Sequence, residues 1–296
     1  MVKKYLINLI LIFIFIVVAI ECYLIFIDYG KSNVYFYEND EYLGYKVKSN
    51  SKGIYTELNN RNFLSFNNKG ERIFHDIGYT EKLNLIILGD GLISGWAYPE
   101  NKSLEYYLNN NFGIKDMSVL NLSVPGYGTI QQYLQISSLE KYNFRKLVII
   151  VNLENNFQKN KTIYELKESE LPYINQEKDI LLPNKEYIKS YHRLFTKLSI
   201  YKLLQDFKNS FIKTSVSKKQ TTDMIENTKF LCELIKQKAN EKNIDLKIIG
   251  VSRFEENKID NLDHFILLDK IYYNEIDHLT EEGLFLLSKK IWEYLK

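Results

Sequence analysis

Short apolar runs that alternate with amphipathic segments set the limits on how this chain can fold. The first run, Leu83–Leu88, ends in Gly-Asp-Gly, and four further runs follow it at 118–122, 146–151, 246–251 and 265–268. Runs of this length without polar alternation are typical of strands buried on both faces of a parallel sheet. The pattern predicts an α/β fold, a three-layer α/β/α sandwich whose parallel sheet has about five strands.

Helical periodicity appears between and after these runs. We expect helices at 103–110, 129–141, 222–240 and 279–295, with Thr222 or Asp223 capping the third of them. The stretch 157–220 interrupts the alternation, with an expected hairpin inside 171–182 and an expected helix at 188–211 that contains His192. We interpret this stretch as an insertion over one rim of the sheet, either a lid or an added packing layer.

The first part of the chain is a continuous apolar segment at 5–27, long enough for a helix to cross a membrane. Lys3 and Lys4 precede it, and the positive-inside rule places residues 1–4 in the cytoplasm and the rest outside. The sequence thus predicts an uncleaved single-pass signal anchor in the cell membrane. A cleaved signal peptide or a lipid on Cys22 remains the alternative. The anchor is followed by a lead-in segment at 28–80 and the main domain at 81–296.

Composition excludes several classes of function. The 39 basic and 37 acidic side chains give a formal charge of +2, which offers no electrostatic basis for nucleic-acid binding. The two cysteines, Cys22 and Cys232, form no disulfide framework and have no partners at metal-ligand spacing. We therefore expect no metal site and no cofactor.

Polar segments follow the predicted strands where a parallel sheet places its ligand site, beyond the carboxyl ends of the strands. Ester hydrolysis needs a nucleophile at a strand-to-helix turn, donors for the oxyanion, and a histidine oriented by a carboxylate. The candidate segments are Gly89-Asp-Gly91, Ser123-Val-Pro-Gly-Tyr-Gly128, Asn152-Leu-Glu-Asn-Asn156 and Glu275-Ile-Asp-His278.

In this order and spacing, the four segments resemble the conserved blocks of the SGNH/GDSL hydrolases, which have a flavodoxin-like fold. The lead-in motif Asn67-Asn-Lys-Gly70-Glu-Arg72 is similar to one found in a membrane-linked branch of that family. The resemblance covers about residues 40–296. It implies that His278 is the general base and that Gly126 and Asn155 donate hydrogen bonds to the oxyanion.

The chain departs from the family at the nucleophile. The block that should read Gly-Asp-Ser has Gly91 after Asp90, and glycine has no side chain that could attack a carbonyl carbon. Ser94 lies three residues further on, in the first turn of the expected helix. It is a possible substitute, although a serine that satisfies the N–H groups of the helix start is the simpler interpretation.

Two further departures concern side chains that could assist catalysis. Asn156 stands where the family has Asp, and Glu275 stands three residues before His278 where the family has Asp. Glu275 can still orient an imidazole, whereas the adjacent Asp277 would usually point elsewhere. His278 could instead cap the last helix.

The resemblance implies an ester hydrolase or acyltransferase scaffold, and Gly91 favours a pseudoenzyme. We expect a membrane-anchored extracytoplasmic protein that binds an acylated envelope glycan, a lipid or a partner in envelope acyl transfer. The alternative is an active esterase or O-acyltransferase that uses a non-standard nucleophile, or a water activated by His278.

Overall fold

The computed structural model describes residues 2–26, 36–57, 60–74, 83–112, 118–160, 171–175, 177–183, 218–274 and 278–296. The chain divides into two compact units, one made of residues 1–34 and 185–216 and the other of residues 35–184 and 217–296. The predicted helix at 188–211, with His192, lies outside the described residues.

The first unit contributes one described element, helix α1 (Val2–Phe26). Most of the described apolar side chains of α1 are exposed, and those of Leu9, Phe13 and Phe15 are each more than half exposed. No helix in the described part of the chain has both the length and the apolarity of a membrane span.

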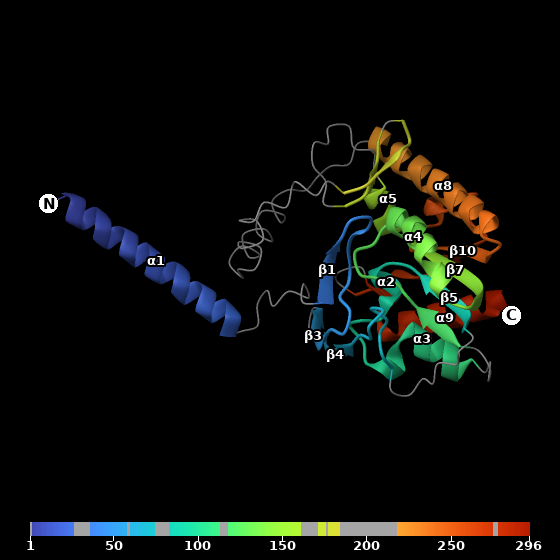
Figure 1. Ribbon diagram of the computed structural model, residues 1–296, viewed down its shortest axis with the longest axis horizontal. Helices are drawn as coiled ribbons and strands as arrows, with labels where there is room; N and C mark the ends of the chain where they lie inside the picture. The colour runs from blue at the N-terminus through green and yellow to red at the C-terminus, as the bar shows by residue number, and fades with distance from the viewer. Residues whose placement is uncertain are drawn as a thin grey trace. The chain divides into compact units, whose positions relative to one another are not determined.

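The second unit is built on a five-stranded sheet in the order β11-β10-β7-β5-β6, with every neighbouring pair parallel (Figure 1). The strands are β5 (Leu83–Leu88), β6 (Val119–Asn121), β7 (Phe144–Asn152), β10 (Asp245–Ser252) and β11 (His264–Leu267). All five lie at the predicted apolar runs, so the α/β fold with a parallel sheet is confirmed. The strands coincide with the apolar runs because side chains on both faces of the central strands are buried.

Helices cover both faces of the sheet and complete the three layers (Figure 1). One face packs against α2 (Gly91–Ser94), α3 (Leu104–Tyr106), the π-helical turn Tyr107–Asn111 and α9 (Glu281–Leu295). The other packs against α4 (Thr129–Gln135), the 3-10 turn Ile136–Lys141, α5 (Leu153–Lys159) and α8 (Lys218–Glu241). Shorter 3-10 turns are Glu100–Lys102, Glu255–Asn257 and Lys270–Tyr272.

Within the predicted insertion, β8 (Tyr173–Ile174) and β9 (Ile180–Leu181) form the expected antiparallel hairpin. The predicted cap of the following helix is wrong. Helix α8 begins at Lys218, so Thr222 and Asp223 lie inside its first two turns and cannot be the residue that precedes the helix. We had located the helix from its apolar residues, and the first of these lies several residues after the point where the helix begins.

The lead-in segment folds as two antiparallel hairpins, β1 (Tyr37–Asp40) with β2 (Gly44–Val47) and β3 (Lys52–Glu57) with β4 (Asn60–Ser65). Neither hairpin was predicted from the sequence. An aromatic cluster centred on Trp96 joins the hairpins to the loop after α2; its buried members are Phe36, Tyr55, Leu64, Phe66, Trp96 and Ala97. The lead-in thus packs on the loop that follows Gly91.

The Asn-x-x-Gly-x-Arg motif has a structural role. The side-chain oxygen of Asn67 accepts hydrogen bonds from the backbone N–H groups of Lys69 and Glu71, and Gly70 completes the turn with φ +76°. The turn directs Arg72 inward, where its guanidinium donates to the carbonyl oxygens of Gly95 (2.8 Å) and Tyr98 (3.0 Å). Arg72 is 7% exposed, so these two hydrogen bonds are made away from water.

We expect Arg72→Met to lower the free energy of unfolding by about 2–3 kcal/mol, because two buried carbonyl groups lose a charged donor. Urea unfolding followed by circular dichroism measures this, and Arg145→Met, which removes the same charge from an exposed position, is the matched control. Equal stability of the two variants would contradict the role given to the motif.

Candidate functional site

Gly91 is the first residue of α2, directly after β5, at the predicted strand-to-helix turn. Asp90 is the N-cap, and its Oδ1 accepts a hydrogen bond from the backbone N–H of Leu92 at 2.9 Å. Its Oδ2 accepts one from Asn152 Nδ2, at the end of β7, at 3.2 Å. Asp90 is therefore a buried structural carboxylate that fixes the turn on which Gly91 lies.

The imidazole of His278 lies against Gly91. A Cβ atom on Gly91 would lie 3.4 Å from His278 Cε1, 3.6 Å from His278 Nε2 and 3.5 Å from Pro125 Cα. These are ordinary van der Waals distances. The imidazole thus faces the position from which the side chain of residue 91 would extend.

The carboxylate that binds the histidine comes from the lead-in segment. His278 Nδ1 is 2.9 Å from Glu57 Oε1, so Nδ1–H donates to Glu57 and Nε2 of the neutral ring is left as an acceptor toward residue 91. Glu57 is the last residue of β3, far from the histidine in sequence, and it was missed. Glu275, which we predicted for this role, and the adjacent Asp277 lie outside the described residues.

The backbone around His278 holds the ring in place. The Asn274 side chain accepts a hydrogen bond from the His278 N–H at 3.0 Å, and the Asn274 N–H donates to the His278 carbonyl at 2.7 Å. Helix α9 is capped by Thr280, whose hydroxyl accepts from the Gly283 N–H at 3.2 Å. The alternative in which His278 caps this helix is therefore wrong.

Opposing influences act on the pKa of His278. Burial lowers the pKa, and so does the nearby positive charge of Lys159. The hydrogen bond to Glu57 and the negative charges of Glu57 and Asp90 raise it. The balance raises the pKa of His278 above its ordinary value. The imidazolium is thus stabilised by Glu57 in the folded protein.

This raised pKa predicts a pH dependence of stability. Because folding favours the protonated ring, the contribution of His278 to the free energy of unfolding is complete below the unfolded-state pKa of about 6.5. It is lost as the pH rises through the folded-state value. We therefore expect the stability difference between the unsubstituted chain and His278→Gln to shrink as urea unfolding is repeated at increasing pH from 5.5 to 8.5. A difference that is constant or grows with pH would contradict the Glu57 interaction.

The loop after β6 carries the predicted oxyanion donor Gly126. Its φ of +90° suits glycine, and a Cβ there would lie 2.3 Å from the Tyr45 hydroxyl, so space and backbone conformation both demand glycine. Tyr45 donates to the Pro125 carbonyl (2.9 Å), and Lys159 donates to the Tyr127 carbonyl (3.0 Å). The loop is thus held from two sides.

The other residues predicted for the site are Asn155, Asn156 and Ser94. Asn155 belongs to α5, and its side chain lies outside the described part of the structure. The Asn156 side chain is buried and donates to the Thr129 hydroxyl at 3.2 Å. Ser94 donates to the Gly91 carbonyl at 3.3 Å and lines a separate cleft, whereas Gly91, Glu57 and His278 line a common cavity of about 10 Å³.

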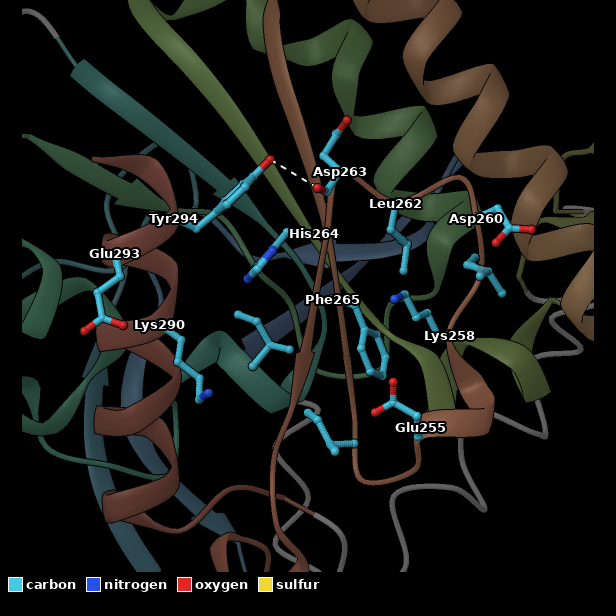
Figure 2. A pocket seen from close by; sticks show the side chains of 13 residues that line it. Glu255, Lys258, Asp260, Leu262, Asp263, His264, Phe265, Lys290, Glu293 and Tyr294 are labelled. Atoms are coloured by element: carbon cyan, nitrogen blue, oxygen red, sulfur yellow. Dashed lines mark hydrogen bonds between the residues drawn. The ribbon is translucent and has the colours of Figure 1, made fainter.

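A larger hollow of about 880 Å³ lies away from this site, along edge strand β11 and the end of α9 (Figure 2). Its wall includes His264, whose ring stacks on Tyr294 with centroids 4.4 Å apart, and Lys290 (Figure 2). Burial and the charge of Lys290 lower the pKa of His264. None of the predicted site residues lines this hollow, and among the described residues no cluster of metal-binding side chains occurs.

Comparisons with known proteins give only distant likenesses. No protein-family model and no curated protein matches the chain. Its neighbours among solved structures include two esterases and a lipolytic protein of the G-D-S-L family. The esterase EstA from Pseudoalteromonas sp., inhibited by monoethylphosphonate, is 12% identical, with 72% of this chain and 96% of that chain covered and a TM-score of 0.39.

Two further structures are similar to the same degree. A lipolytic protein of the G-D-S-L family from Veillonella parvula is 14% identical, with 71% of this chain and 97% of that chain covered and a TM-score of 0.34. Est24, a carbohydrate acetylesterase from Sinorhizobium meliloti, is 11% identical, with 72% and 98% covered and a TM-score of 0.30. Likenesses this distant say nothing about activity.

Proposed function

We propose that this chain is a membrane-anchored extracytoplasmic protein with an SGNH/GDSL-type site that binds an acylated ligand without hydrolysing it. The observation that carries the proposal is the position of Gly91. The base and its orienting carboxylate are assembled around this residue, yet it has no atom that could attack a carbonyl carbon. An acylated envelope glycan, a lipid or a partner in acyl transfer is the proposed class of ligand.

The anchor is proposed from the sequence of residues 5–27, with the two lysines that precede it, and from the exposed apolar side chains of α1. In that arrangement the second unit lies outside the cytoplasm. Its ligand would be a component of the cell envelope.

Measuring ester hydrolysis by the purified full chain tests the proposal that the protein does not hydrolyse its ligand. We expect 4-nitrophenyl acetate to be hydrolysed no faster by the unsubstituted chain than by His278→Ala. Asn274→Asp is the companion variant, because the Asn274 side chain bonds to the backbone N–H of His278 and is not proposed to transfer protons. Turnover by the unsubstituted chain that His278→Ala abolishes would show that the protein is an enzyme.

An active esterase is the second candidate, favoured by one observation. The cavity of about 10 Å³ beside Gly91, Glu57 and His278 is close to the volume that holds a single water molecule. With Glu57 on Nδ1, Nε2 could accept a proton from such a water during its attack on an ester. This candidate predicts a solvent isotope effect on a His278-dependent rate, without a covalent acyl intermediate.

A further inference from the structure

The second hairpin of the lead-in, β3 with β4, has apolar side chains on both of its faces. Its inner face carries Tyr55 and Leu64, which are buried in the cluster around Trp96. In an antiparallel sheet with one buried face, the other face normally meets water and is polar. Here Ile54 and Phe63, which are directly opposite each other across the two strands, are 54% and 61% exposed on the outer face.

The apolar part of the outer face extends beyond this pair. After the turn that follows β4, the Ile73 N–H donates to the Ser65 carbonyl at 2.8 Å, and Phe66 and Arg72 form an antiparallel bridge. Ile73 therefore lies beside β4 on the same face as Phe63, and it is 41% exposed. Single exposed apolar residues need no explanation, whereas several on one face indicate an interaction surface.

Basic side chains flank the apolar residues. Lys52 and Arg61 are exposed and belong to the same outer face, one at each end of the hairpin. The acidic side chains described in the hairpin and the turn after it are engaged elsewhere: Glu57 binds the imidazole of the candidate site, and Glu71 accepts a hydrogen bond from Asn67 at 2.6 Å. Apolar side chains flanked by cations suit a bilayer surface with anionic headgroups.

The path of the chain limits how far this face can lie from a membrane that holds α1. Phe36 is the first described residue after α1, and it is buried against the inner side of the same hairpin, with its ring 6.3 Å from that of Tyr55. The chain from Phe26 to Phe36 can span at most about 36 Å even when fully extended. A bilayer is therefore within reach of the hairpin, since this limit is close to the thickness of one hydrocarbon core, about 30 Å.

We propose that Ile54, Phe63 and Ile73 dock the second unit onto the lipid bilayer. They enter the boundary between headgroups and acyl chains, and Lys52 and Arg61 contact anionic headgroups. The inference rests on the proposed membrane anchor and adds a second contact to it. With two contacts, the orientation of the second unit relative to the membrane is fixed.

A bimane probe on single cysteines of the full chain tests the proposal, in vesicles of phosphatidylethanolamine and phosphatidylglycerol. Cys22→Ser removes the exposed thiol of α1, and the buried Cys232 is retained. Phe63→Cys carries the probe on the hairpin face, and Arg145→Cys carries it at an exposed position at the start of β7. We expect lipids brominated high on the acyl chain to quench the probe at 63 at least about twofold more than the probe at 145, because docked side chains reach that depth.

Ile54→Ser combined with Ile73→Ser should lower the quenching at position 63 to that at position 145. Phe254→Ser combined with Ile271→Ser removes two exposed apolar side chains outside the hairpin and should change nothing. Circular dichroism shows that each variant is folded.

The outcomes separate this inference from the anchor. A chain that does not sediment with the vesicles would refute the anchor, and the docking with it. Sedimentation with equal quenching at the two positions would overturn the docking alone. So would a blue-shifted but unquenched probe at 63, because protein rather than lipid would then cover the face, or quenching that the paired isoleucine changes leave unaltered.

Discussion

Replacing Gly91 by serine should convert this chain into an esterase, with a gain of about a thousandfold or more in kcat/KM for 4-nitrophenyl acetate. The scale comes from serine hydrolases, in which loss of the nucleophile removes most of the rate acceleration and leaves only that of the oxyanion hole and binding. The Cβ atom of the new side chain meets no contact shorter than 3.4 Å, and Gly91 does not have a positive φ. The substitution should therefore fold without strain.

The geometry explains why a hydroxyl at this position should be active at once. Its Cβ would lie 3.6 Å from His278 Nε2, so a side-chain rotation can place the oxygen within hydrogen-bonding reach of the base. Gly91→Ala adds the same Cβ without the oxygen and is the matched control. Labelling by an organophosphonate ester should occur in Gly91→Ser alone. Equal rates for the two variants would show that the site lacks more than its nucleophile.

Glu57→Gln, in the Gly91→Ser background, should lower kcat/KM by about a hundredfold or more. A neutral amide can neither stabilise the imidazolium nor fix the tautomer that leaves Nε2 free, and comparable changes in serine proteases reach about ten-thousandfold. Glu57 acts through His278, so it is a positioning residue. Its pH signature separates it from a packing role, because loss of the carboxylate should move the His278-dependent limb of the kcat/KM profile to lower pH.

Three matched changes make this prediction specific. Glu38→Gln removes a carboxylate from the neighbouring hairpin. Glu275→Gln removes the carboxylate that the sequence resemblance favours, and Asp277→Asn removes the one adjacent to His278 in the sequence. Each should lower kcat/KM less than tenfold. A loss in Glu275→Gln as large as that in Glu57→Gln would return the orienting role to the segment before the histidine.

The central sheet could be predicted because its strands are buried on both faces, and a short continuous apolar run such as Leu83–Leu88, bounded by turn residues, is typical of such a strand. The second hairpin of the lead-in could not be predicted in this way. Ile54 and Phe63 are exposed on it, and its burial comes from packing on Trp96, a contact between distant parts of the chain. A local pattern contains no information about such a contact.

The site was predictable to the same extent. Asp90, Gly91 and His278 follow or precede elements that have clear patterns of their own, and the fold brings them together beyond the carboxyl end of β5. Glu57 ends a strand with no such pattern, and its partner lies at the opposite end of the domain sequence. Glu275 was predicted instead because it stands where the resembled family has Asp, three residues before His278.

The position of Glu57 also limits which segments of this chain could be replaced by the corresponding segments of another protein. Strand β3 supplies the carboxylate, the turn before α9 supplies the imidazole, and Arg72 and Tyr45 fasten the same hairpins to the loops around Gly91. A chimera that took the sheet and its helices from another protein of similar fold while keeping this lead-in would separate the carboxylate of Glu57 from the imidazole of His278. Recombination is therefore expected to preserve function when a single crossover falls before residue 36, or when two crossovers both fall within the long insertion, so that Glu57 and His278 come from one parent.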